Sequence, residues 1–118
     1  MENYLKLEWP QGCRQLFIHA IINIIQNGID ALKDKNIPNG QITISNNTNE
    51  NILLSISDNA GGIDKNIINS LFNKTYSSKL TGMGIGLSIT KDILEKEFNY
   101  SISIENINNG VRVIIQWK

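Results

Sequence analysis

The chain has 118 residues, a length that suits one domain with a modest core. Its 11 basic and 11 acidic residues give a formal net charge of zero, and 41% of the residues are hydrophobic, as in ordinary globular domains. It contains no long basic run and no apolar stretch of about 20 residues, so we expect no nucleic acid partner and no direct membrane contact.

The single cysteine, Cys13, cannot form an internal disulfide, and the first ten residues lack the apolar run of a signal peptide. Both features predict a cytoplasmic setting. The composition is biased toward isoleucine and asparagine, with 22 and 17 copies. An isolated asparagine therefore carries little information, and any argument from asparagine needs support from neighbouring residues.

The first predicted element is a short strand over 4–9, which Pro10 ends. A long helix is predicted over 11–34, because apolar residues recur at helical spacing on one face and polar residues occupy the other. Two β-branched runs, 41–46 and 51–58, predict a pair of strands joined as a hairpin.

In the second half, Asp64 is expected to cap a short helix over 64–72, and a polar loop follows over 73–83. A third helix is predicted over 84–97, and residues 100–106 and 111–118 alternate as a second hairpin. The order predicts an α+β fold in one domain over 1–118. This is a two-layer α/β sandwich, with a mixed, largely antiparallel sheet of about five strands on about three helices.

Glycine occupies every second position of "GMGIG", residues 82–86, directly before the third predicted helix. Unpaired N–H groups at a helix start attract anions, and glycine lets a phosphate approach, although a flexible loop would also use glycines. Lys79 lies three residues before Gly82, where a positive charge is unfavourable for the helix dipole unless an anion lies between them. This placement indicates a phosphate site.

Asn23 and Asn27 lie four residues apart on the long helix, so their side chains point the same way. Their amides could serve a hard cation and phosphates, or they could reflect the asparagine bias. Asp58 ends a predicted strand just before Gly61 and Gly62, where its carboxylate could accept a hydrogen bond from an amine in a pocket. An ordinary turn is the alternative.

Together and in this order, these segments resemble the catalytic ATP-binding domain of bacterial sensor histidine kinases, which has the Bergerat fold shared with gyrase-type (GHKL) ATPases. "INIIQNGIDAL" (22–32) is similar to that family's N box and "DNAGGI" (58–63) to its G1 box. "LFNKTYSSK" (71–79) resembles its F box and lid, and "GMGIGLSI" (82–89) its G2 box. Two departures are Ala60, where the family usually has glycine, and Gly28, where it usually has alanine.

The resemblance implies ATP and Mg²⁺ as ligands. It implies that Asn27 coordinates Mg²⁺, that Asn23 contacts the phosphates, and that Asp58 accepts from the adenine amino group and so selects ATP over GTP. Asn23 and Lys79 are the implied catalytic residues, with Lys79 reaching the terminal phosphate. The other implied nucleotide contacts are Gly62, Ile63, Phe72, Gly82, Gly84, Gly86 and Leu87. The lid over 73–83 is expected to be mobile without nucleotide and ordered by a γ-phosphate.

Gyrase-type ATPases usually carry a water-activating glutamate at the position of Asn23, and an asparagine cannot act as that base. The resemblance therefore implies a kinase that donates the γ-phosphoryl group to a histidine on a dimerisation domain, of the same protein or a partner, with a response regulator downstream. We expect that domain to lie outside this chain, because its only histidine, His19, lacks the acidic neighbour typical of the acceptor. The alternatives are an anti-sigma-type serine kinase and a pseudokinase that binds nucleotide as an interaction module.

Overall fold

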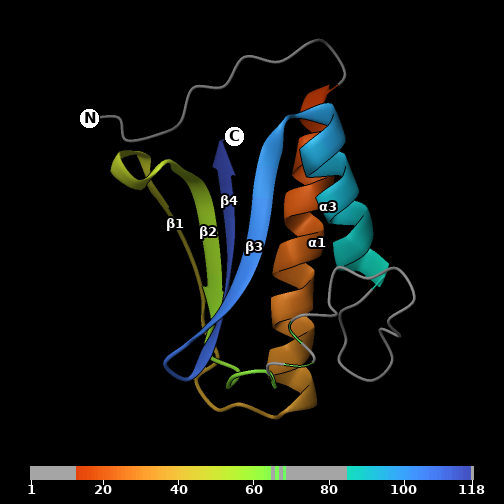
Figure 1. Cartoon of the computed structure of the whole chain (residues 1–118). Helices are drawn as coiled ribbons and strands as arrows, with labels where there is room; N and C mark the ends of the chain where they lie inside the picture. Colours follow the sequence, from red (N-terminus) through yellow and green to blue (C-terminus); the bar gives the residue numbers. More distant parts are fainter. Residues whose placement is uncertain (1–12, 65, 67, 69–84, 118) are drawn as a thin grey trace.

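A computed structural model describes residues 13–64, 66, 68 and 85–117 (Figure 1). The long helix α1 spans Cys13–Asp34, and the strands β1 and β2 follow at Ile42–Asn47 and Ile52–Asp58. A short 3-10 helix, η1 (Thr48–Glu50), lies between these strands. The helix α3 covers Ile85–Glu97, and the last two strands are β3 (Tyr100–Ile107) and β4 (Gly110–Trp117).

The strands form one sheet in the order β1-β2-β4-β3, and each neighbouring pair is antiparallel. Both helices cover the same face of this sheet (Figure 1), so the chain is an α+β two-layer sandwich and the predicted fold class is confirmed. The described part holds four strands, all antiparallel, rather than about five in a mixed sheet. The predicted strand over 4–9, the loop over 73–83 and most of the helix over 64–72 lie outside the described residues.

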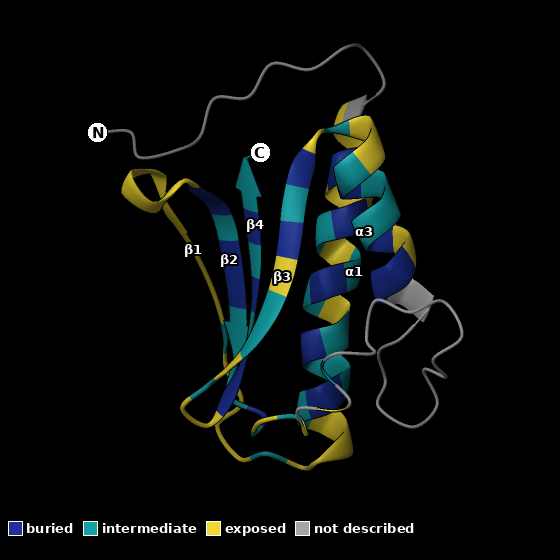
Figure 2. Ribbon diagram, in the orientation of Figure 1, coloured by how far each residue is buried: buried dark blue, intermediate teal, exposed yellow. Residues whose placement is uncertain are grey.

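The core lies between the helices and the sheet, where buried positions repeat along α1 at helical spacing (Figure 2). Phe17, Ala20 and Ile24 of α1 pack in one cluster with residues of β2 and β4, including the fully buried Leu53 and Ile115. Burying a side chain of this size contributes about 1.5–3 kcal/mol, so this stripe fixes α1 across the sheet. The predicted apolar stripe of the helix is confirmed as the core-facing one.

Asparagine supplies the left-handed backbone positions in the described residues. The residues with positive φ other than glycine are all asparagines: Asn36, Asn39, Asn51, Asn99 and Asn109. Asparagine tolerates this conformation better than other residues with a Cβ, because its short polar side chain can bond locally. Part of the asparagine bias thus serves the turns between elements and says nothing about a ligand.

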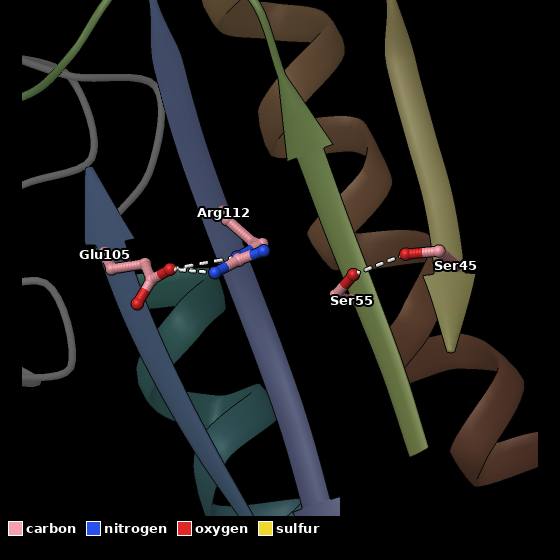
Figure 3. Close-up of polar contacts among 4 residues, drawn as sticks. All are labelled: Ser45, Ser55, Glu105 and Arg112. Carbon is pink, nitrogen blue, oxygen red and sulfur yellow. Dashed lines mark hydrogen bonds and ion pairs between the residues drawn. The ribbon is translucent and has the colours of Figure 1, made fainter. Parts of the chain in front are cut away.

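The sheet face turned away from the helices carries polar cross-strand pairs (Figure 3). The Ser45 and Ser55 hydroxyls lie 2.8 Å apart across β1 and β2, and Arg112 of β4 donates from Nε and Nη2 to the Glu105 carboxylate of β3. Side chains alternate between the faces of a strand. Because Glu105 points away from the helices, its neighbour Asn106 points toward the helix layer.

Candidate functional site

Asp58, the last residue of β2, turns its side chain toward α1. A Cβ added to Gly28 of α1 would lie 3.7 Å from Asp58 Oδ2, and Asp58 Oδ1 accepts a hydrogen bond of 3.0 Å from the Ala60 N–H. Burial raises the pKa of the Asp58 carboxyl, an effect that the N–H groups of Ala60 and Val111 and the charge of Lys35 partly offset. The arrangement presents a half-buried acceptor at the end of a strand.

Asn23 and Asn27 lie one turn apart on α1, and both are partly buried. The Asn27 Nδ2 atom is buried, and it is the one such side-chain nitrogen in the described residues without a hydrogen-bond partner. An unpaired buried donor costs about 1–3 kcal/mol, so it points to an acceptor that binds there. Gly28 follows Asn27 and lies beside Asp58, so the N-box segment and the strand end lie at the same end of the sandwich.

The segment 58–63, which we call the G1 loop, is tied to the β3–β4 hairpin. The Gly61 N–H donates to the Asn109 carbonyl at 2.9 Å. Gly61 has φ +84°, a left-handed conformation that glycine adopts without strain, so the sharp turn requires this residue. Ile63 packs against the core cluster, and its main chain is hydrogen-bonded to Asn106.

On its other side the G1 loop is tied to the connection between α1 and β1. Asn59 Oδ1 accepts from the Gln41 N–H at 2.7 Å, and Asn59 Nδ2 donates to the Asn39 carbonyl at 3.1 Å. The loop is therefore held from two sides, by the α1–β1 connection and by the β3–β4 hairpin. A loop fixed in this way can present its backbone in one conformation to a flat ligand.

Gly110, the first residue of β4, lies beside the end of β2, its neighbour in the sheet. A Cβ at this position would come within 1.8 Å of the Asp58 carbonyl oxygen and 2.8 Å of the Asp58 carbonyl carbon. No side chain fits there without moving the backbone. The Asp58 main chain therefore lies directly against Gly110.

The start of α3 contributes Gly86 and Leu87 to the predicted site. Leu87 has 1% of its surface exposed and belongs to the core cluster, so a role toward a nucleotide would fall to its main chain. Four other predicted site residues lie outside the described residues: Phe72, Lys79, Gly82 and Gly84. Their roles, and the ordering of the lid over 73–83, stay predictions.

The two departures from the family pattern have local explanations. At Gly28, Cδ1 of Ile42 lies 2.8 Å from where an alanine Cβ would be, so the isoleucine fills the space of the missing methyl group. At Ala60 the side chain is buried, with 2% exposure, and the Ala60 N–H still donates a hydrogen bond to Asp58 Oδ1. Both changes leave Asp58 in contact with its neighbours.

Sequence reasoning missed three residues that shape this site: Asn59, Asn106 and Gly110. The two asparagines were hidden by the compositional bias, and their partners lie 18 to 43 positions away in sequence. In the sequence, Gly110 looks like an ordinary glycine of a hairpin turn. No local pattern could have identified them, because each acts through a tertiary contact.

The family model described as histidine kinase-, DNA gyrase B-, and HSP90-like ATPase matches residues 12–118. Sensor protein FixL of Bradyrhizobium diazoefficiens is 29% identical over 91 residues, covering 77% of this chain and 18% of that protein. The C4-dicarboxylate transport sensor protein DctB of Rhizobium meliloti is 29% identical over 108 residues, which cover 91% of this chain and 17% of DctB. Sporulation kinase C of Bacillus subtilis is 35% identical over 88 residues, or 74% of this chain and 19% of that kinase.

Among solved structures, the nucleotide-free catalytic domain of the histidine kinase ThkA superposes with a TM-score of 0.70 at 29% identity, covering 87% of this chain and 66% of that one. The chain spans less than a fifth of the length of the curated relatives just named. Within residues 13–64, 66, 68 and 85–117, no helix has the length and apolarity needed to cross a membrane. The chain belongs to the histidine kinase-, DNA gyrase B- and HSP90-like ATPase family, as an ATP-binding domain of the sensor histidine kinase type.

Proposed function

We propose that this domain binds Mg²⁺-ATP and donates the γ-phosphoryl group to a histidine on a separate dimerisation domain, with a response regulator as the next acceptor. Membership of the ATPase family implies ATP as the ligand. The observation that carries the proposal is the unpaired, buried Asn27 Nδ2 on α1, next to Gly28, which lies beside the Asp58 carboxylate. ATP as the donor places the reaction in the cytoplasm.

The Asp58 end of the site would bind the base. The carboxylate accepts hydrogen bonds, as the adenine amino group requires, and guanine presents a carbonyl oxygen at the equivalent position. Gly62 and Ile63 would lie along the base through their main chain, which the Asn106 side chain holds at Ile63. Selection of ATP over GTP would follow because guanine has no amino group at that position to donate to the half-buried Asp58 carboxylate.

The α1 end of the site would bind the phosphates and the metal. The Asn27 amide has an oxygen suited to a hard cation and a buried nitrogen that needs an acceptor, which a phosphate oxygen supplies. Asn23, one turn earlier, faces the same side and would contact the phosphates. Mg²⁺ when bound would neutralise phosphate charge during transfer. Lys79, Gly82, Gly84 and Gly86 would surround the terminal phosphate, with Phe72 at the base of the lid and Leu87 contributing its N–H.

Transfer rather than hydrolysis follows from the absence of a general base at position 23. An asparagine amide has no proton-accepting function near neutral pH, so Asn23 can position a phosphate but cannot activate water. Positioning and charge neutralisation suffice for phosphoryl transfer to a nucleophile that another domain supplies. A serine kinase of the anti-sigma type and a pseudokinase are less favoured, since the curated relatives named above are sensor proteins and a sporulation kinase.

The test is incubation of the chain with γ-labelled ATP and a histidine-containing dimerisation domain of a related sensor kinase. Label should appear on the dimerisation domain, should be acid-labile as in phosphohistidine, and should disappear when the acceptor histidine is replaced by alanine. His19→Ala in this chain is the matched control, because His19 is exposed on α1 and should leave transfer unchanged. Label on a serine of the partner, or ATP binding without transfer, would favour one of the alternatives.

A further inference from the structure

Asn106 lies near the end of β3, on the side of the sheet that faces the helices. Its neighbour Glu105 is paired with Arg112 on the opposite face, which fixes the alternation of the strand at this point (Figure 3). The Asn106 side chain is thereby directed toward the G1 loop.

Both ends of the Asn106 amide bind the main chain of one residue of that loop. Asn106 Oδ1 accepts from the Ile63 N–H at 2.8 Å, and Asn106 Nδ2 donates to the Ile63 carbonyl at 2.8 Å. A two-point contact of this kind fixes the orientation of a peptide as well as its position. It links segments that are 43 residues apart in sequence.

Gly62 lies close to the same Asn106 side-chain amide. A Cβ on Gly62 would lie 3.0 Å from Asn106 Oδ1 and 3.4 Å from Asn106 Cγ, and Gly62 does not adopt a left-handed φ. A Cβ on Gly62 would therefore press on the Asn106 amide, which would have to shift by a few tenths of an ångström to admit it. Gly61, by contrast, is needed for its left-handed conformation, since the nearest atom to its Cβ is Lys35 Nζ at 3.8 Å.

We propose that Asn106 is a positioning residue for base recognition, which holds the Gly62–Ile63 main chain in the conformation that receives adenine. The inference rests on the proposed function, in which this loop contacts the base. Asn106 acts through Ile63 and not on the nucleotide. Its contribution is preorganisation: a loop that is already ordered loses less conformational entropy when the ligand binds. Because the contacts are exposed, the expected effect on affinity is moderate, about tenfold.

The test uses the 118-residue chain with Asn106→Ala, Asn106→Asp and the control Asn108→Ala, which alters an exposed residue of the same hairpin. Asn106→Asp keeps the acceptor for the Ile63 N–H and loses the donor to the Ile63 carbonyl, so its effect should be intermediate. Hydrogen exchange in the nucleotide-free protein should show faster exchange of the Ile63 amide in Asn106→Ala and not in Asn108→Ala. Thermal unfolding establishes that each variant is folded.

The decisive readout is the ratio of ATP to GTP affinity. A general loss of stability would lower both affinities by the same factor and leave this ratio unchanged. Asn106→Ala should weaken ATP about tenfold and GTP little, so the ratio falls. In an Asp58→Ala background, where base recognition is already lost, Asn106→Ala should have almost no further effect on ATP. An unchanged ratio, or full additivity with Asp58→Ala, would overturn the assignment of Asn106. Wild-type protein that binds no ATP would overturn the proposed function itself.

Discussion

At the scale of single residues, the candidate site contains polar groups whose burial is energetically unfavourable in the protein without ligand. Burial raises the pKa of the Asp58 carboxyl, so its environment disfavours the ionised form, which is the form that the proposed recognition of adenine would use. Asn27 keeps a buried amide nitrogen without a partner among the described residues. Such groups are unfavourable in the empty protein and become satisfied when a ligand supplies the missing partner.

The raised pKa of Asp58 predicts how stability depends on pH. A carboxyl whose pKa is higher in the folded than in the unfolded state stabilises the fold below the unfolded pKa, about 4, and this contribution is lost as the pH rises through the folded pKa. The Asp58→Asn variant has no ionisable group at this position. Its free energy of unfolding, relative to wild type, should therefore increase as the pH rises from about 3 toward neutrality and then level off.

Urea unfolding of both proteins at a series of pH values measures this difference. The slope is the informative quantity, because a comparison of Asp58→Asn with wild type at a single pH also includes the altered hydrogen bonds to Ala60 and Val111. A difference that stays constant, or that falls as the pH rises, would contradict the burial of an ionisable carboxyl at this position.

At the scale of elements, two glycines set how closely the layers and strands approach. Gly28 lets α1 lie over the end of β2, where Ile42 Cδ1 occupies the space that a methyl group would take. Gly110 lets β4 begin directly against the Asp58 carbonyl of the neighbouring strand. The first contact involves the tip of a flexible side chain and the second involves rigid backbone, so substitutions at the two positions should have opposite consequences.

We expect Gly28→Ala to be tolerated and to depend on Ile42. Alanine is favoured over glycine in a helix interior by about 1 kcal/mol, but its Cβ would meet Ile42 Cδ1 at 2.8 Å. In an Ile42→Val background, which lacks Cδ1, Gly28→Ala should raise the free energy of unfolding by about 1 kcal/mol, and by less when Ile42 is present. Denaturant unfolding of the four proteins gives the coupling. An equal gain in both backgrounds would contradict the contact.

Gly110→Ala should be strongly destabilising, by about 3 kcal/mol, because its Cβ would overlap the Asp58 carbonyl and only a shift of the backbone can relieve the overlap. The same shift would displace Asp58, so ATP affinity should fall as well. Asn108→Ala, at an exposed position of the same turn, is the matched control for urea unfolding and nucleotide titration. A loss below about 1 kcal/mol would be inconsistent with the close approach.

Helices and strands with strong hydrophobic periodicity could be predicted from sequence, whereas hydrogen bonds between residues distant in sequence could not. The apolar stripe of Phe17, Ala20 and Ile24 identified α1 and its buried face, and alternation identified both hairpins within one or two residues of their bounds. The left-handed asparagines and the ties made by Asn59 and Asn106 were not predictable. An asparagine in a biased composition looks the same whether it turns a loop or bonds a residue 43 positions away.

At the scale of the whole molecule, the fold brings together motifs from both layers. The N box lies on α1 in the helix layer, and Asp58 and the G1 loop follow a strand of the sheet. They meet where Gly28 lies beside Asp58, since a Cβ on Gly28 would be 3.7 Å from Asp58 Oδ2. The family resemblance implied that these motifs share one site. The sheet order β1-β2-β4-β3 brings them near each other, since β2 lies inside the sheet and packs against α1.

The central claim is that Asn27, together with Asp58, belongs to one Mg²⁺-ATP site. Asn27→Ala is a suitable probe because it removes a buried donor that has no partner in the described structure and places a better helix former in α1. The variant should therefore be at least as stable as wild type. A loss of binding could then be assigned to the missing amide and not to unfolding.

The most direct measurement is calorimetric titration of ATP into wild-type protein and Asn27→Ala, each with and without Mg²⁺. We expect Mg²⁺ to tighten ATP binding to the wild type by about tenfold or more, equivalent to at least about 1.4 kcal/mol, and to have little effect on the folded variant. Equal tightening in the two proteins would remove Asn27 from the metal site. A wild-type protein that binds no ATP under either condition would contradict the account as a whole.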